Sequence, residues 1–320
     1  MTLVKIAGVG GYLPEKIYDN RHLESLVDTS NEWIMERTGI RERHIAGTDE
    51  LSSDLAFRAS VLALKNAKMK PAEIDAIILA TVTPDVFFPS SAVILQKKLG
   101  IGSNCFAFDA QAACSGFLYG LELADSLIKT GKAKNILLAA AETLSKITNW
   151  SDRSTCVLFG DGAGAVALTA AEEENSGIIF SKISSDGSYF DILKTAGGIG
   201  KGLKNIFIEM QGREVFKLAV NKMCESITDC LEKLKLTLDD VKIIIPHQAN
   251  QRILESVAKK LNISPSKLHS TVEIHGNTAA ASIPLALFDA WERGKIKKGD
   301  LVLFEALGAG LTWGIAALRW

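Results

Sequence analysis

Three side chains in the sequence, those of Cys114, His247 and Asn277, could together carry out acyl transfer. Cys114 lies after an extended apolar run, 105–108, and before a segment, 117–129, whose apolar residues have the spacing of a helix with one buried face. A thiol at the start of a helix lies near unpaired N–H groups and the positive end of the helix dipole, and both favour the nucleophilic thiolate. A single cysteine is more often a small buried hydrophobic residue, so the rest of the chain has to decide between the two interpretations.

An internal repeat relates the three residues to one another. Four pairs of blocks recur in the same order: 77–79 and 243–245, 96–101 and 258–263, Gly131 and Gly294, and 160–168 and 308–318. At the offset that aligns Gly131 with Gly294, Cys114 falls on Asn277. His247 follows the second copy of an apolar strand. Strand-end loops are where α/β folds bind ligands, so we expect Cys114, His247 and Asn277 to meet where the two copies join.

The repeat predicts an α/β fold made of two duplicated halves related by a pseudo-twofold axis. Strands are expected at 3–11, 74–81, 135–141, 161–168, 241–245, 301–305 and 312–319, and helices at 52–68, 90–99, 117–129, 212–234, 252–261 and 278–292. The charge-rich stretch 171–177 separates the halves. We therefore place an N-terminal half with the cysteine at 1–172 and a C-terminal half with the histidine and the asparagine at 173–320.

Composition excludes several classes of protein. The chain has 320 residues, 47% of them hydrophobic and 23% charged, and a net charge of −1, so it has no overall attraction for nucleic acid or an anionic membrane. Five scattered cysteines do not form a disulfide framework and indicate a reducing compartment. Because the sequence shows no signal-peptide pattern, membrane-spanning run or metal-ligand spacing, we expect a cytoplasmic protein without a metal.

Four motifs carry a resemblance to a known family. They are Ala-Ala-Cys-Ser-Gly-Phe around Cys114, Pro-His-Gln-Ala-Asn around His247, Gly-Asn-Thr-Ala-Ala-Ala-Ser-Ile-Pro around Asn277, and Gly-Leu-Thr-Trp-Gly around Trp313. From its N-terminal strand to Trp320 the chain resembles the β-ketoacyl-[acyl carrier protein] synthase III family of the thiolase-like superfamily. The resemblance implies a five-layered αβαβα fold, a homodimer, and condensation of an acyl-coenzyme A with malonyl-[acyl carrier protein] that initiates fatty acid synthesis. It implies no cofactor apart from coenzyme A carried by the substrate.

The chemistry of that reaction suits the three residues. The Cys114 thiolate would attack the primer thioester and form an acyl-enzyme. The Cys114 N–H and the loop 308–310, through the Ala309 N–H, could bind the tetrahedral oxyanion. Neutral His247 and Asn277 could each donate an N–H to the enolate that forms when the second substrate loses carbon dioxide.

The resemblance also implies roles for residues around the centre. Coenzyme A would be bound by Trp33, Arg37, Thr38, Arg153 and Asn250, with the adenine between Trp33 and Arg153. The acidic carrier protein would contact Lys217, Gln248, Arg252, Lys259 and Lys260, with Arg213 as a possible addition, although each lysine alone also fits an ordinary solvated helix face. The acyl pocket would be formed by Leu144, Phe159, Leu193, Leu307 and Phe88, the last reaching into the partner subunit.

Two alternatives remain open at this point. Chalcone-synthase-type polyketide enzymes also use cysteine, histidine and asparagine, and a non-catalytic acyl-binding scaffold could keep the same fold. Thiolases use a second cysteine that this chain lacks in the matching motif, and elongating synthases use a second histidine in place of Asn277. Many relatives carry phenylalanine where this chain has Leu307, which leaves the length and branching of the primer open.

Overall fold

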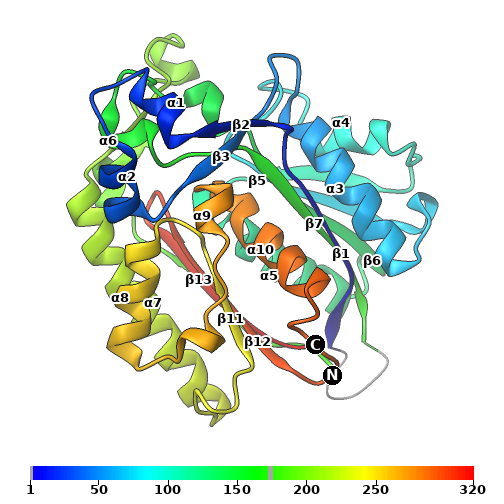
Figure 1. The fold of residues 1–320 in the computed structure, drawn as a ribbon. Helices are drawn as coiled ribbons and strands as arrows, with labels where there is room; N and C mark the ends of the chain where they lie inside the picture. The colour runs from blue at the N-terminus through cyan, green and yellow to red at the C-terminus, as the bar shows by residue number, and fades with distance from the viewer. Residues whose placement is uncertain (1–2, 172–175) are drawn as a thin grey trace.

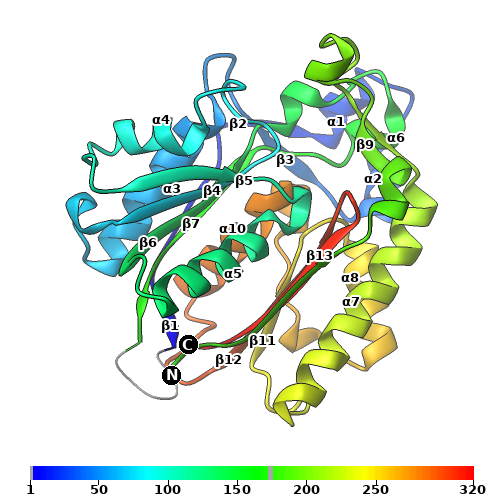
Figure 2. The same cartoon turned by 180° about the vertical axis from the view of Figure 1, so that it is seen from behind.

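The computed structural model describes residues 3–171 and 176–320 and contains two large β-sheets with helices on and between them (Figures 1 and 2). The first sheet has the order β1-β7-β6-β4-β5, and the second has the order β11-β12-β13-β8. None of the helices in these two ranges is long and apolar enough to cross a membrane.

The two halves contain the same elements in the same chain order. The N-terminal half has β1 (Val4–Tyr12), α3 (Ser52–Ala67), β4 (Ala76–Ala80), α4 (Ser91–Lys98), β5 (Phe106–Ala110), α5 (Gly116–Lys129), β6 (Asn135–Glu142) and β7 (Gly162–Ala170). The C-terminal half has β8 (Gly177–Ser185), α7 (Gly212–Leu234), β11 (Ile243–Pro246), α8 (Gln251–Leu261), α10 (Ser282–Glu292), β12 (Leu301–Gly308) and β13 (Thr312–Arg319). In place of a counterpart of β5, an isolated parallel bridge joins Ile244 to Leu268. The predicted duplication is thus confirmed by the order of the elements.

Successive side chains of the buried strands point to opposite faces of each sheet, and helices cover both faces, so five layers result. On β4, Ile77 and Leu79 pack toward α3 and α4, whereas Ile78 packs toward the central helices α5 and α10. On the second sheet, Ile245 also faces the central helices, and Ile244 faces α7 and α8. Since both faces of each sheet are covered, the central strands are continuously apolar. The order is α3 and α4, sheet, α5 and α10, sheet, α7 and α8, which confirms the expected αβαβα fold.

The structure corrects the register of the predicted repeat in two places. Helix α5 begins at Gly116 and α10 begins at Ser282, so the residue placed like Cys114 is Ala280, three residues beyond Asn277. The match of 77–79 with 243–245 is wrong by an odd number of residues, because it pairs residues that face opposite sides of their sheets. Cys114 and Asn277 are therefore not symmetry counterparts.

Several elements lie outside the repeat and were not expected as elements. They are β2 (Lys16–Asp19), α1 (Asn20–Glu24), β3 (Glu42–Ile45), α6 (Arg153–Cys156), β9 (Leu193–Thr195), β10 (Ile208–Met210) and α9 (Val272–His275). Helix α2 (Asn31–Thr38), which ends at Gly39, also lies outside the repeat. The short 3₁₀ turns are η1 (Pro71–Glu73), η2 (Ala113–Ser115), η3 (Leu144–Ile147), η4 (Gly187–Ile192), η5 (Ile199–Lys201), η6 (Pro265–Lys267) and η7 (Ala279–Ala281). Strand β8, the edge of the second sheet, was also missed.

The join between the halves lies beside both ends of the chain. The proposed boundary between residues 172 and 173 falls outside the described residues, but the flanking strands are clear. Val4 pairs with Ala170 on one side, and Gly177 pairs with Arg319 on the other. Both views place the N- and C-termini side by side at this point (Figures 1 and 2).

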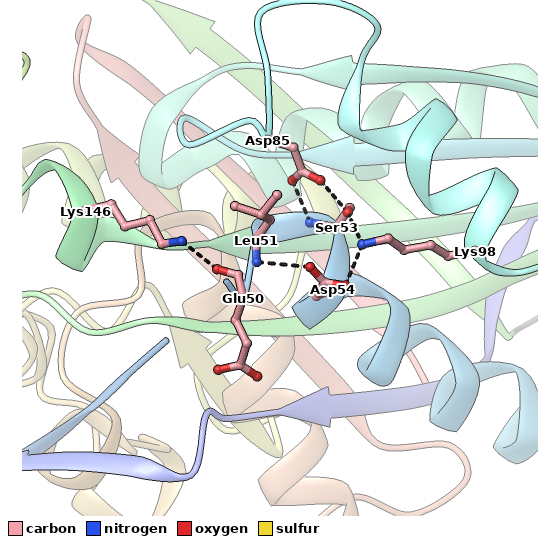
Figure 3. Close-up of polar contacts among 7 residues, drawn as sticks. All are labelled: Glu50, Leu51, Ser53, Asp54, Asp85, Lys98 and Lys146. Carbon is pink, nitrogen blue, oxygen red and sulfur yellow. Dashed lines mark hydrogen bonds and ion pairs between the residues drawn. The ribbon is translucent and has the colours of Figure 1, made fainter. Parts of the chain in front are cut away.

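Polar contacts at the start of α3 hold the loop that follows β4. Figure 3 shows Asp85 accepting hydrogen bonds from the backbone N–H and the hydroxyl of Ser53, and Lys98 of α4 bonded to both Ser53 and Asp54. Lys146 donates to the carbonyl of Glu50 in the same region. These contacts fix the base of the 83–89 loop, whose tip carries Phe88.

Candidate active site

Cys114 lies in η2, the 3₁₀ turn immediately before the buried helix α5. The 308–310 loop approaches it so closely that a Cβ on Gly308 would lie 2.6 Å from the Cys114 backbone N. Thr312 reinforces this contact, because its hydroxyl donates to Ala112 O at 2.8 Å and to Ala309 O at 3.1 Å. Only glycine fits at position 308, and the loop is held against the cysteine from the second half of the chain.

The ionisation of Cys114 differs from the sequence-based expectation. Burial, and to a smaller extent the carboxylate of Glu142, raises the pKa of the thiol to about 12, against the opposing effect of its own backbone N–H. The prediction that the helix start favours the thiolate is therefore wrong in direction for this structure, because desolvation outweighs the N–H groups. Cys114 is a neutral thiol at neutral pH.

His247 follows β11 and is buried in the neutral form. Burial lowers its pKa to about 3. Its Nδ1 lies 2.7 Å from the Ser282 hydroxyl, and that oxygen also accepts the Gln248 N–H at 3.3 Å. In the arrangement in which Ser282 accepts the Gln248 N–H and donates its own proton to Nδ1, the ring proton lies on Nε2.

Asn277 is fixed by its backbone and by one side of its amide. Its N–H donates to Leu158 O at 2.9 Å, and its carbonyl accepts from Gly160 N at 3.0 Å, so it forms a short parallel bridge beside Phe159. The side-chain Oδ1 accepts the Ala279 N–H at 2.9 Å. With Oδ1 held by the backbone, the Nδ2 group remains as a hydrogen-bond donor.

One cavity of about 580 Å³ brings Cys114, His247 and Asn277 together. Its walls near these residues are apolar, with Val157, Leu158, Phe159, Ala219, Met223 and Leu307 among the lining side chains. Three exposed arginines, Arg37, Arg213 and Arg252, line the same cavity. The site therefore has a desolvated end with a thiol and two N–H donors, and a cationic end open to solvent.

Two guanidinium groups lie near the ring of Trp33 at the cationic end. Arg37 lies 5.0 Å and Arg153 lies 4.9 Å from the centroid of that ring, and Arg153 also donates to Asp28 O at 2.8 Å. Two residues that were expected to bind coenzyme A near Trp33 form hydrogen bonds within the protein. The Thr38 hydroxyl donates to Ile34 O, and Asn250 caps α8 while donating to Arg37 O.

The residues expected to bind a carrier protein have different surroundings. Arg252 lines the cavity, and Lys217 and Lys259 are exposed on α7 and α8. Lys260 is exposed but belongs to a second hollow of about 660 Å³, and it donates to Asn221. The assignment of Gln248 is contradicted: its side chain is only 1% exposed, and its amide bonds Pro246 O, His269 O and Thr271 N.

The residues expected in the acyl pocket also have different surroundings. Phe159, Leu193 and Leu307 line the cavity, and Leu144 is buried in the apolar cluster that contains Cys114 and Phe159. Phe88 is 86% exposed at the tip of its loop. It is not among the residues that line the cavity of its own chain, and its place in the acyl pocket of a partner stays a prediction.

The sequence reasoning missed Glu142 and Ser282. Glu142 is fully buried at the end of β6, where it accepts from Thr81, Thr83 and the Val82 N–H, and burial raises its pKa to about 7. The available signal was one acid in an otherwise apolar strand. No group of three or more His, Cys, Asp or Glu side chains suited to a metal occurs in residues 3–171 and 176–320.

A duplicated five-layer fold with a cysteine, a histidine and an asparagine on one cavity is that of the thiolase-like condensing enzymes. Residues 108–187 match the family model of 3-oxoacyl-[acyl-carrier-protein] synthase III, and residues 231–320 match the model of its C-terminal part. A β-ketoacyl-[acyl-carrier-protein] synthase III of Rickettsia bellii is 51% identical over 99% of both chains, and one of Thiobacillus denitrificans is 50% identical over the full length of both. The chain belongs to the β-ketoacyl-[acyl-carrier-protein] synthase III family, and it is an acyltransferase.

Solved structures agree with this assignment. The crystal structure of 3-oxoacyl-[acyl-carrier-protein] synthase III from Aquifex aeolicus has a TM-score of 0.94 at 48% identity, covering 99% of this chain and all of that one. The priming β-ketosynthase of the R1128 polyketide pathway has the same TM-score of 0.94 at 32% identity, covering 99% of this chain and 96% of its own. The polyketide relative shares the fold, but it is more distant in sequence.

Proposed function

We propose that this enzyme condenses an acyl-coenzyme A primer, first of all acetyl-coenzyme A, with malonyl-[acyl carrier protein] and so initiates fatty acid synthesis. The observation that carries the proposal is the single cavity that joins Cys114, His247 and Asn277 to a mouth lined by arginines. A coenzyme A thioester has the same division, since its nucleotide end is anionic and its reactive end is a neutral thioester. Arginine binds phosphate through charge-assisted hydrogen bonds, which suits the mouth to the nucleotide.

The first half-reaction acylates Cys114. The thiol sulfur forms a bond to the thioester carbonyl carbon, and the Cys114 and Ala309 N–H groups bind the resulting oxyanion. Because the thiol is neutral and Nε2 of His247 already carries the ring proton, the thiol proton is passed to the sulfur of the leaving coenzyme A and not to His247. Collapse of the tetrahedral species breaks the bond to coenzyme A, whose sulfur takes that proton and leaves as the thiol.

The second half-reaction uses the side-chain N–H groups of His247 and Asn277 as hydrogen-bond donors. The bond between the malonyl methylene carbon and its carboxylate breaks, carbon dioxide leaves, and the electron pair forms an enolate. Nε2–H of His247 and Nδ2–H of Asn277 stabilise the enolate oxygen in a site that excludes water. The enolate carbon then attacks the acyl group, and the Cys114 thiolate leaves and recovers a proton.

The cationic end of the cavity binds coenzyme A and, at its rim, the acyl carrier protein. Adenine stacks on Trp33, and Arg153 has to move away from the ring to form the other side, because at 4.9 Å the two side chains are in contact. Arg37 and Arg213 bind phosphates. The exposed Lys217, Arg252 and Lys259 attract the acidic carrier protein.

A homodimer completes the acyl pocket. Strand β5 is an edge of the first sheet, and an unpaired edge is a template for another strand. On this strand Phe106 is 41% exposed and stacks on Phe108 with ring centroids 6.5 Å apart. Pairing of β5 with its copy would cover both rings and bring Phe88 to the partner. Sedimentation at micromolar concentration tests this, and a monomer would contradict it.

The reaction is tested by offering the acetylated enzyme malonyl-coenzyme A and malonyl-[acyl carrier protein] in competition. We expect one acetyl mass on Cys114 after incubation with acetyl-coenzyme A, and product formed mainly from the carrier-protein thioester. A primer panel from acetyl to branched and longer acyl groups then measures the effect of Leu307.

Two outcomes would contradict the proposal. A strong preference for malonyl-coenzyme A would favour a polyketide-type condensing enzyme, an alternative kept because the R1128 enzyme shares the fold. Absence of an acetyl adduct, with a Cys114→Ser protein behaving identically, would indicate a non-catalytic scaffold.

A further inference from the structure

Arg43 is a buried cation that the proposed mechanism does not use. It lies on β3, in the two-stranded sheet β2-β3 outside the two large sheets, and it is 0% exposed. No carboxylate of residues 3–171 and 176–320 forms an ion pair with it, and its Nε has no hydrogen-bond partner there. Burial lowers the pKa of the guanidinium to about 10, so it remains charged at neutral pH. An unpaired buried charge costs several kcal/mol, and a role that needed only shape would be filled by an apolar residue.

The hydrogen bonds of Arg43 connect two separate segments. Nη1 donates to Tyr18 O at 3.0 Å and to Asn20 Oδ1 at 2.9 Å, whereas Nη2 donates to Val157 O at 2.9 Å. The planar fork of a guanidinium makes these contacts from one rigid group, which a lysine cannot do. Arg43 therefore ties the β2–α1 junction to the segment after α6.

The segment after α6, which Arg43 contacts through Val157, holds the backbone of Asn277. Val157 begins the run to Gly160 that forms both backbone hydrogen bonds of Asn277. The backbones also converge on Arg43 itself, since Cβ atoms built on Gly160 and Gly276 would each lie 3.1 Å from the Arg43 Cβ. A shift of Arg43 would therefore be passed to the backbone on which the Asn277 amide is mounted.

On the side of the β2–α1 junction, Arg43 reaches the helix at the cavity mouth. Asn20, which accepts from Arg43, donates to Ile40 O at 2.9 Å and to Asn31 Oδ1 at 3.1 Å. Asn31 is the first residue of α2, the helix that carries Trp33. The backbone of the turn that carries Cys114 is held by Gly308 and Thr312, which form none of the hydrogen bonds of Arg43, although the thiol packs in the same apolar cluster as Val157.

We propose that Arg43 is a positioning residue for condensation: its guanidinium sets the 157–160 backbone against which Asn277 is aligned, and it leaves the nucleophile to other contacts. The inference rests on the proposed function, because it assigns Asn277 to the second half-reaction. It predicts that damage at Arg43 affects the two half-reactions unequally.

The test measures the half-reactions separately in Arg43→Lys, with Arg41→Lys as the matched control. Arg41 is a neighbouring arginine with a 55% exposed side chain and surface ion pairs to Glu42 and Glu273. Acylation is followed by the acetyl mass on Cys114, and condensation by single turnover of acetylated enzyme with malonyl-[acyl carrier protein]. We expect acylation within about 3-fold of wild type and condensation about 10- to 100-fold slower, in kcat more than in KM, as displacement of a reacting group by up to 1 Å would cause.

Equal losses in both half-reactions, or no loss of condensation, would overturn the assignment. A second variant, Asn20→Ser, keeps Arg43 and removes one of its acceptors. It should show the same selective loss at smaller size, and an unselective loss would count against the proposal even if Arg43→Lys fails to fold. The wild-type enzyme is measured in the same experiment to separate the role of Arg43 from the proposed function. If the wild-type enzyme is acylated but does not condense, the proposed function is wrong, whatever Arg43 does.

Discussion

The turn before α5 and the turn before α10 occupy the same place in the two halves, yet only the first carries a nucleophile. In the N-terminal half this turn holds Cys114, and the corresponding position of the C-terminal half is Ala280. A Cβ on Gly116 would lie 3.2 Å from that of Ala280, so the two helix starts are in close contact. The C-terminal half instead supplies His247 and Asn277 from the loops around its turn. Duplication thus produced the framework twice, whereas each functional group occurs once and is positioned in part by the backbone of the other half.

The largest expected effects separate the two contributions. Cys114→Ser should lose the acetyl adduct and at least about 10³-fold in overall rate, because the nucleophile is gone. Asn277→Ala should still be acetylated but should condense about 10²- to 10³-fold more slowly, as for removal of an oxyanion donor. Intact-protein mass and single-turnover condensation distinguish them. If Asn277→Ala cannot be acetylated at all, the division of labour between the halves is wrong.

A smaller effect is expected where one half supports the other. Gly308→Ala would place a methyl group 2.6 Å from the Cys114 N, so the oxyanion site must open. We expect acetylation to slow about 10- to 100-fold, the range for small displacements of a catalytic group. Gly187→Ala is the control, since a Cβ there meets nothing within 4 Å. Unchanged acetylation by Gly308→Ala would show that the close approach is not needed.

The smallest effects concern two buried glutamates with different surroundings. Glu142 accepts hydrogen bonds from Thr81, Thr83 and the Val82 N–H, whereas neither oxygen of Glu305 has a partner among the described residues. The charge of Glu142 also raises the pKa of Cys114. Glu142→Gln should therefore speed alkylation of Cys114 by iodoacetamide at pH 8 by a few-fold, about 2- to 10-fold. Glu305→Gln should leave that rate unchanged, and equal rates in all three proteins would contradict the coupling.

Glu142→Gln and Glu305→Gln should also change how the free energy of unfolding depends on pH. Both carboxyls have raised pKa values in the folded state, to about 7 for Glu142 and well above the ordinary value for Glu305. Above about pH 4.5 the unfolded chain loses a proton that the folded protein keeps, so wild type loses stability relative to each glutamine variant as pH rises. For Glu142 the difference should stop growing near pH 7, and for Glu305 it should continue. Urea unfolding at pH 5, 7 and 8 measures both.

The sequence predicted the framework better than its register. Long helices such as α7 matched, because their apolar periodicity is strong. The strands that were aligned as repeats, β4 and β11, are apolar on both faces, so nothing in their composition shows which face each residue occupies. A slip by an odd number of residues therefore went unnoticed. The edge strand β8 and the two-stranded sheet β2-β3 were missed, because their half-exposed sequences lack a clear pattern.

The site was predicted in its members but not in its electrostatics. Cys114, His247 and Asn277 do line one cavity. The thiol pKa was expected in the wrong direction, since a sequence shows the helix start but not the depth of burial or a distant acid such as Glu142. Gln248 was expected to contact the carrier protein on the basis of the resemblance, and only the fold shows that its amide is buried.

The meeting of both termini with the junction of the halves has a consequence for chain connectivity. Val4 pairs with Ala170 beside the place where Gly177 pairs with Arg319, so the chain could be closed there by a short linker. A circular permutant that starts at the C-terminal half and ends with the N-terminal half would keep every strand pairing of both sheets. The order of the two halves along the gene is thus free to change, while their contact across α5 and α10 is not.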